Sequence, residues 1–424
     1  MRIERDTYID KLIERMWNGS VKVITGLRRS GKSFIVFELF KDYLLSNGTK
    51  EEDIIEVQLD DIVNASLRHP IRLYEHIRSR CGEEGRKYVL IDEIQMVPKV
   101  KNPYDGGCGE LTFYDTLNGL TKLGRLDIYV TGSNSRMLST DILTEFRGRG
   151  DEIRVHPLSF SEYYSAVGGD RMMAFQTYQR YGGMPHILSI ASDESKEKYL
   201  RDLFTETYIK DIRERHRIDR IDVMEGTIDV LCSSIGSLTN PTNIANAISE
   251  KVSDNTVKTY IGHLIDSFLF SEAKRYDVKG RNYLKYPVKY YCEDIGLRNA
   301  RLGFRQIEAT HIMENILYNE LVNRGFNVDV GMVTADEKDA SGKIVRKRKE
   351  VDFVVNKGNM YVYIQSAFSI PDEEKMAQEK SPLDRIRGSF PKVIIRMDTF
   401  GKWYDDDGIL HINLVDFLLD KDSI

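Results

Sequence analysis

The chain contains 424 residues, of which 41% are hydrophobic and 30% are charged, and its formal net charge at pH 7 is -5. This length exceeds one ordinary hydrophobic core, so we expect a globular protein of two or three domains. The acidic balance excludes a uniformly basic, histone-like binder but not a local basic face, because affinity for nucleic acid follows clustered Lys and Arg rather than the total.

Short β-type runs alternate with helical patterns between residues 21 and 135. The runs are rich in β-branched and aromatic residues and cover residues 21–25, 53–59, 87–92 and 127–132. Amphipathic segments lie between them, among them residues 33–45 and 71–80. This alternation predicts a mostly parallel sheet with helices on both faces, in which a ligand binds beyond the carboxyl ends of the strands.

The first predicted strand runs into a segment that matches G-x-x-x-x-G-K-[ST], a phosphate-binding loop. Its glycines let the backbone curl so that N–H groups point at phosphate oxygens, and the next helix adds the positive end of its dipole. Lys32 would reach the β- and γ-phosphates of ATP, and the Ser33 hydroxyl would ligate Mg²⁺. The predicted nucleotide-binding residues are Gly26, Leu27, Arg28, Arg29, Ser30, Gly31, Lys32, Ser33 and Phe34.

The apolar run at residues 88–91 ends in two acids, Asp92 and Glu93. Two carboxylates buried at a strand end without partners would be costly. At the exposed end of a strand beside the phosphate loop, Asp92 would hold Mg²⁺ and Glu93 would orient or deprotonate the attacking water. The sequence therefore predicts ATP hydrolysis as well as ATP binding.

The predicted catalytic residues are Lys32, Glu93 and polar or basic groups that follow the strand at residues 127–132. Ser133 or Asn134 is the candidate for a group near the γ-phosphate and the attacking water, although either could simply cap a helix. Arg149, on the glycine-flexible turn 146–150, is the candidate for a cation that stabilises the γ-phosphate in the transition state, in cis or from a neighbouring subunit. The alternative for this arginine is a surface salt bridge.

The middle of the chain is predicted to be helical from residue 160 to 220, with a Gly-Gly-Met-Pro turn at residues 182–185. Residues 241–267 have helix-turn-helix spacing, and residues 274–285 read as a basic β-hairpin, or wing. Double-stranded DNA is the candidate partner for residues 240–285, and a protein partner is the alternative. The predicted DNA contacts are Lys258, His263, Lys274, Arg275, Lys279 and Arg281.

The last part of the chain reads as a helix followed by strands. We expect the helix at residues 311–324 and the strands at residues 328–330, 350–355 and 361–368. The very polar segment 338–350 is predicted to be a hairpin tip or a mobile loop.

The motifs resemble those of the prokaryotic AAA-type ATPases that carry a C-terminal domain of uncertain function. The resemblance covers nearly the whole sequence, through VITGLRRSGKS, YVLIDEIQ, VTGSNSRMLS, FRGRG, GGMP, KYYCEDIGLRNA, HIMENILYNEL, EVDFVV and YVYIQSAFSI. It implies an α/β fold with a P-loop NTPase (AAA-type) parallel sheet core that has an additional strand. It also implies a helical lid, a winged helix and a C-terminal α/β restriction-endonuclease-like domain. We expect boundaries at residues 1–158, 159–222, 223–296 and 297–424.

A restriction-type nuclease would need more than that fold. It requires an acid on a helix, an Asp on a strand and Glu-x-Lys on the next strand, so that carboxylates hold Mg²⁺ and the Lys activates water. Glu314 or Glu320 matches the helical acid and Asp352 the strand acid, but Gln365 and Ala367 stand where Glu and Lys are required. We therefore expect the fold to serve nucleic-acid or protein contact rather than cleavage.

The sequence as a whole predicts a cytoplasmic ATPase that uses ATP and Mg²⁺ as a nucleotide-driven switch on DNA or a protein partner, as a possible homo-oligomer. The alternatives are an ATP-controlled DNA nuclease and a regulator gated by ATP with little turnover. The four cysteines form no C-x-x-C pair, which suits a reducing compartment. We expect no membrane segment and no secretory signal, because no apolar run is long enough to span a bilayer and the first residues are charged.

Overall fold

The computed structural model describes residues 2–82, 84–106, 109–132, 146, 150–248, 251–305, 308–338 and 344–424. Contacts divide the chain into two compact units, which we call unit 1 (Met1–Pro157 with Asp266–Phe268) and unit 2 (Leu158–Ile265 with Leu269–Ile424). The four boundaries expected from the sequence stay a prediction. Among the helices of the described ranges, none is both long enough and apolar enough to cross a membrane.

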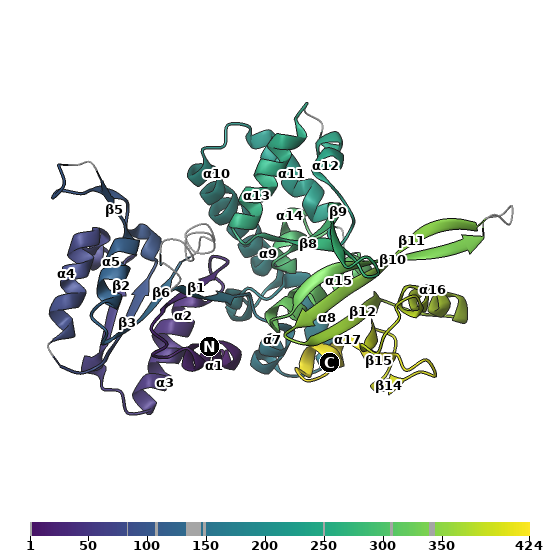
Figure 1. Ribbon diagram of the computed structural model, residues 1–424, viewed down its shortest axis with the longest axis horizontal. Helices are drawn as coiled ribbons and strands as arrows, with labels where there is room; N and C mark the ends of the chain where they lie inside the picture. Colours follow the sequence, from purple (N-terminus) through teal and green to yellow (C-terminus); the bar gives the residue numbers. More distant parts are fainter. Residues whose placement is uncertain are drawn as a thin grey trace. The chain divides into compact units, whose positions relative to one another are not determined.

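Unit 1 is built on a five-stranded parallel sheet in the order β2-β3-β6-β1-β7 (Figure 1). Its strands are β1 (Val21–Gly26), β2 (Ile54–Gln58), β3 (Lys87–Asp92), β6 (Leu126–Thr131) and β7 (Gly150–Val155). The predicted alternation of strands and helices is confirmed, and β6 is inserted between β1 and β3. This additional strand brings the end of β6 between the phosphate loop and the acids that close β3.

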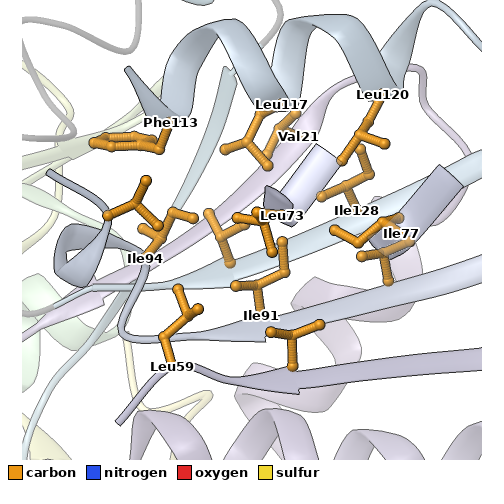
Figure 2. Close-up of a cluster of buried hydrophobic side chains, with 14 of the residues drawn as sticks. Val21, Leu59, Leu73, Ile77, Ile91, Ile94, Phe113, Leu117, Leu120 and Ile128 are labelled. Atoms are coloured by element: carbon orange, nitrogen blue, oxygen red, sulfur yellow. The ribbon is translucent and has the colours of Figure 1, made fainter. Parts of the chain in front are cut away.

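Helices cover both faces of this sheet because its strands are apolar on both sides. The helices are α1 (Asp6–Glu14), α2 (Lys32–Phe34), α3 (Lys41–Ser46), α4 (Pro70–Cys81) and α5 (Phe113–Thr121). On one face, Leu73 and Ile77 of α4 and Leu117 of α5 pack against strand residues such as Ile91 and Ile128 (Figure 2). On the other face, α1 and the continuous helix after the phosphate loop bury a second cluster. A short antiparallel pair, β4 (Val100–Lys101) and β5 (Glu110–Leu111), is added between β3 and α5.

Unit 2 begins with helices and ends with a mixed sheet. Its helices are α7 (Phe160–Val167), α8 (Arg171–Tyr181), α9 (Asp193–Asp202), α10 (Lys210–His216), α11 (Ile221–Ser233), α12 (Pro241–Ala247), α13 (Asp254–Asp266), α14 (Ile295–Arg301), α15 (Ala309–Asn323), α16 (Glu373–Asp384) and α17 (Leu414–Leu419). The Gly-Gly-Met-Pro turn is held by Asp294, which caps α14 and accepts a hydrogen bond from the Gly183 N–H at 2.7 Å. A Cβ on Gly183 would lie 2.2 Å from the Leu158 carbonyl oxygen, so this turn requires glycine.

The sheet of unit 2 has eight strands in the order β14-β15-β13-β12-β11-β10-β8-β9 (Figure 1). They are β8 (Phe270–Asp277), β9 (Asn282–Cys292), β10 (Asn327–Lys338), β11 (Ile344–Lys357), β12 (Met360–Ala367), β13 (Lys392–Arg396), β14 (Lys402–Tyr404) and β15 (Leu410–Asn413). The predicted wing is the β8–β9 hairpin, and β8 pairs in parallel with β10. The wing is therefore an integral edge of the C-terminal sheet.

The polar segment 338–350, which was predicted to be a hairpin tip or a mobile loop, is mostly strand. Backbone pairing of β10 with β11 continues to the register pair Lys338 and Ile344, so most of the segment belongs to a long hairpin. Cross-strand pairing satisfies the backbone N–H and C=O groups of the paired residues. Residues 339–343 lie outside the described ranges.

Candidate functional site: a phosphate-binding loop beside two acids

The phosphate loop connects the carboxyl end of β1 to α2 in unit 1. Gly26 and Gly31 have φ values of +132° and +97°, which disfavour a side chain. A Cβ on Gly26 would also lie 2.0 Å from the Val155 carbonyl oxygen of β7. The loop can therefore pass this close to the neighbouring strand only with glycine at this position. The helix it opens runs through a π-helical stretch (Ile35–Phe40) into α3.

Lys32 lies folded over the loop that precedes it. Its Nζ donates hydrogen bonds to the carbonyl oxygens of Gly26 at 3.1 Å and Leu27 at 3.0 Å. Burial lowers the pKa of Lys32 to about 8, although Glu93 and Asp92 act in the opposite direction. A buried ammonium held by loop carbonyls and close to acids is well placed to receive an anion.

Ser33 and Asp92, the two predicted metal ligands, are brought together. The Ser33 hydroxyl donates to Asp92 Oδ1 at 2.9 Å, although the residues are far apart in the sequence. The same carboxylate oxygen accepts a hydrogen bond from the hydroxyl of Thr131, which closes the inserted strand β6 and is fully buried. Thr131 was not among the residues predicted for the site, because a threonine at the end of a strand is an ordinary β residue.

Glu93 follows β3 in a left-handed conformation, with φ of +52°. Its N–H donates to Thr131 Oγ1 at 3.0 Å, and its carboxylate accepts a hydrogen bond from the Gln95 side chain. Burial raises the pKa of Glu93, while the nearby Lys32 lowers it. A non-glycine residue in this conformation costs on the order of 1–3 kcal/mol and is common at functional sites. The signal for Gln95 in the sequence was only its position two residues after the predicted base.

Arg5 supports the loop from behind. Its guanidinium is buried and donates to the carbonyl oxygens of Ser30 at 3.1 Å and His156 at 2.9 Å. It also lies over the ring of Tyr8, 4.6 Å from the centroid. The sequence offered no signal for this role, since Arg5 stands in a charged N-terminal segment.

Three of the predicted catalytic residues lie outside the described residues: Ser133, Asn134 and Arg149. The predicted nucleotide-binding residues Gly26 to Phe34 form one loop and the first turn of its helix. Of the predicted catalytic residues, Lys32 belongs to this loop and Glu93 lies close to Lys32.

The residues predicted to contact DNA are distributed over α13 and the β8–β9 hairpin of unit 2. Lys258, Lys274, Lys279 and Arg281 are exposed. Arg275 was a wrong prediction, because it is only 5% exposed and lies close to Glu350 and Arg348. It stands beside an irregularity in the β8–β9 pairing, where Ala273 pairs with Lys289 but Arg275 pairs with Leu284, so the extra residues are in β9. His263 is half-buried and stacks on His216, with ring centroids 3.7 Å apart.

The acids considered for a nuclease are engaged in an internal network. Glu314 Oε1 accepts hydrogen bonds from Lys289 Nζ at 2.8 Å and the Tyr291 hydroxyl at 2.6 Å, and burial raises the pKa of Glu314 to about 7. Asp352 Oδ2 accepts hydrogen bonds from the Ser366 N–H and hydroxyl, both at 2.8 Å. In the described ranges, no group of three or more His, Cys, Asp or Glu is arranged to hold a metal ion.

The other positions of the nuclease pattern also have structural partners. Glu320 pairs with Arg324 at 2.7 Å, so it does not belong to the Glu314 network. Gln365 donates to Glu379 at 3.1 Å. Lys289, which comes from β9, was not considered from the sequence, because only the pairing of β8 with β10 brings it to α15.

Two family models and two related proteins match this chain. A family model described as an AAA domain matches residues 18–164, and one described as a domain of unknown function (DUF8612) matches residues 172–308. An uncharacterized protein of Haemophilus influenzae is 32% identical over 98% of this chain and 98% of its own length. The uncharacterized protein MJ1544 of Methanocaldococcus jannaschii is 25% identical over 98% of this chain and 88% of its own length.

Solved structures resemble the chain only remotely. The ORC1 protein of Aeropyrum pernix, in complex with DNA, has a TM-score of 0.31 and 12% identity over 72% of this chain and 93% of its own. AMPPCP-bound DnaA from Aquifex aeolicus has a TM-score of 0.31 and 14% identity over 62% of this chain and 89% of its own. Similarity at this level supports no argument about function.

Proposed function

Because the chain belongs to the prokaryotic AAA-type P-loop ATPases, we propose that unit 1 binds ATP with Mg²⁺ and hydrolyses it. One observation carries the proposal: the hydroxyl of Ser33 and the carboxylate of Asp92 meet at 2.9 Å, beside a phosphate loop and a second acid. Burying the carboxylates of Asp92 and Glu93 without a bound cation or another partner would cost free energy, so a function for them is favoured. The arrangement is the one that phosphoryl transfer requires.

The residues present fit Mg²⁺. Ser33 and Asp92 offer oxygen donors, which this hard cation prefers, and they would share its coordination with phosphate oxygens and water. Bound Mg²⁺ would neutralise charge on the phosphates. When ATP binds, the Lys32 ammonium would give up its hydrogen bonds to the two loop carbonyls and donate to the β- and γ-phosphates instead. The new acceptors are anionic, so these hydrogen bonds would be stronger.

Glu93 is our candidate for the base. Burial raises its pKa, so it is a better proton acceptor than an ordinary carboxylate. The left-handed backbone and the hydrogen bond to Thr131 orient it, while Gln95 occupies one of its oxygens. Ser133 or Asn134 and Arg149 remain our candidates for contacts to the γ-phosphate.

We further propose that hydrolysis acts as a switch on a partner of unit 2, either DNA or a protein. Exposed cations on α13 and on the β8–β9 hairpin support DNA. Assembly into a homo-oligomer, in which a neighbour could supply an arginine, belongs to the same proposal. The nuclease alternative gains no support, since Lys289, Tyr291 and Ser366 engage the acids it would need.

The proposal is tested by nucleotide binding and phosphate release, each with and without double-stranded DNA. We expect the parent protein to bind ATP and release phosphate, and Lys32→Ala to lose both. Glu110→Gln, a change at an exposed acid of unit 1, should have no effect and serves as the control. A parent protein that binds no nucleotide would refute the proposal, and one that binds but never hydrolyses would favour the regulator gated by ATP.

A further inference from the structure

Aromatic side chains are exposed together on one face of the unit 2 sheet, from β8, β9, β12 and the segment just before β13. Tyr283 is 61% exposed, Phe390 46% and Tyr361 38%. Tyr276 is half-buried, and Tyr363 is buried in the core cluster on this face. We call these five residues the aromatic face. Contiguous exposed apolar surface on a folded protein commonly marks a binding site.

The rings are arranged in two contacting pairs. Tyr276 and Tyr283 are register partners on β8 and β9, and their ring centroids lie 5.4 Å apart. Tyr361 and Phe390 lie 5.3 Å apart. Tyr361 and Tyr363 alternate on β12 and therefore point to the same face. The strands β11 and β10 separate the two pairs, so β8 and β12 lie about 14 Å apart and the aromatic face extends over about 19 Å from β9 to β12, given a strand spacing of about 4.8 Å.

The exposed rings are held in place rather than free to collapse. The Tyr283 hydroxyl donates to Asp329 Oδ2 of β10 at 2.9 Å. Burial and this hydrogen bond raise the pKa of Tyr283 to about 12, so the phenol stays neutral at physiological pH. A ring fixed in advance loses little conformational entropy when a ligand stacks on it.

Positive charge borders the aromatic face. Lys274, Lys279 and Arg281 on the β8–β9 hairpin are exposed. Burial raises the pKa of Tyr363, and the charge of the nearby Arg281 opposes this shift. In the part of the chain that the structure describes, the charged groups of these three residues form no ion pair. Two acids lie among these cations: Asp329, which accepts from Tyr283 and interacts electrostatically with Lys274, and Asp277, which accepts from the N–H groups of the hairpin turn, so three cations stand against two acids. The surplus of charge is therefore cationic.

We propose that the aromatic face binds single-stranded nucleic acid, with bases stacked on Tyr283, Tyr361 and Phe390 and phosphates paired with the hairpin cations. Aromatic rings on an open sheet can stack on unpaired bases, whereas a duplex keeps its bases stacked on one another. A peptide could use the rings but would need acidic side chains to pair with the adjacent cations, whereas every nucleotide carries a phosphate. This site is separate from the ATP site and names a partner class for unit 2.

The test is binding of fluorescein-labelled oligo-dT, oligo-U and a duplex of equal length to the full chain, followed by fluorescence anisotropy without nucleotide. We expect the single strands to bind more tightly than the duplex, and affinity to fall with added salt. Tyr283→Ala, Tyr361→Ala and Phe390→Ala should each weaken binding about 10-fold or more, because one base stack is lost. Tyr283→Phe keeps the ring but loses the hydrogen bond that fixes it, so it should bind more tightly than Tyr283→Ala and less tightly than the parent.

Phe400→Ala is the matched control. Phe400 is 96% exposed but follows β13, whereas Phe390 precedes that strand, so its loss should leave affinity unchanged. Equal melting temperatures of the variants would show that folding is intact. Absence of oligonucleotide binding, tighter binding to the duplex, or equal affinity of parent and alanine variants would each overturn the proposal. The oligonucleotide assay contains no ATP, so its result does not depend on the proposed ATP hydrolysis. Lys32→Ala, which should lose ATP binding, should therefore bind the oligonucleotides like the parent.

Discussion

Thr131→Val removes one hydroxyl from the centre of the proposed ATP site while keeping the size of the side chain. The hydroxyl donates to Asp92 and accepts from the Glu93 N–H, and the residue is fully buried. Leaving one buried N–H without a partner costs about 1–3 kcal/mol. We expect a lower free energy of unfolding by this amount, and a loss of orientation at Glu93. Misplacement of a catalytic group by about 1 Å can lower turnover on the order of 100-fold.

Two variants separate orientation from stability. Thr131→Ser restores the hydroxyl and should recover most of the turnover. Thr116→Val removes a buried hydroxyl of unit 1 that donates to the Pro70 carbonyl at 2.8 Å, so it should lower stability without affecting turnover. The assay is kcat at saturating ATP and Mg²⁺, together with urea unfolding. If Thr131→Val kept kcat within about twofold of the parent while losing stability, the role given to Thr131 would be wrong.

Further predictions concern charge and helix propensity. Burial lowers the pKa of Lys32 from 10.5 to about 8, so between these pH values the unfolded chain binds more protons than the folded one. The free energy of unfolding without nucleotide should therefore rise with pH from about 8 to about 10.5. Lys32→Met should remove this rise, measured by urea unfolding. Lys289→Met leaves Glu314 and Glu350 without their shared cation and should cost about 3–5 kcal/mol, partly recovered by adding Glu314→Leu; an unchanged melting temperature would contradict the network. Gly262→Ala adds a Cβ to α13 with no atom within 4 Å and should stabilise the protein by about 0.5–1 kcal/mol, measured by calorimetry.

Local pattern was enough to predict the strands β1, β2, β3 and β6 of unit 1 but not β7. The strand β3 begins and ends at the predicted residues, because an apolar run with β-branched residues is bounded by charged ones. Ser33 and Asp92 could be expected to meet, since the carboxyl ends of parallel strands share one edge of the sheet. The phosphate loop needed no tertiary information, because its glycines and lysine are set by local geometry.

Contacts between distant segments could not be predicted in the same way. Lys289 and Glu314 meet only because the β8–β9 hairpin joins the C-terminal sheet, and no local signal specifies a parallel pair between β8 and β10. Arg275 was expected on the surface because a basic hairpin is usually solvated, yet it is buried beside a bulge of extra residues in β9. Strand alternation alone cannot locate such a bulge.

We propose that Glu93, the acid after β3, orients and deprotonates the water that attacks ATP. Glu93→Gln keeps the size and the hydrogen bonding of the side chain but removes the base, so the variant should bind ATP like the parent and hydrolyse it about 100-fold more slowly or worse. The most direct measurement is single-turnover hydrolysis of radiolabelled ATP by both proteins at saturating Mg²⁺. Retention of intact ATP by Glu93→Gln is the predicted result, and hydrolysis at the parent rate would contradict the account.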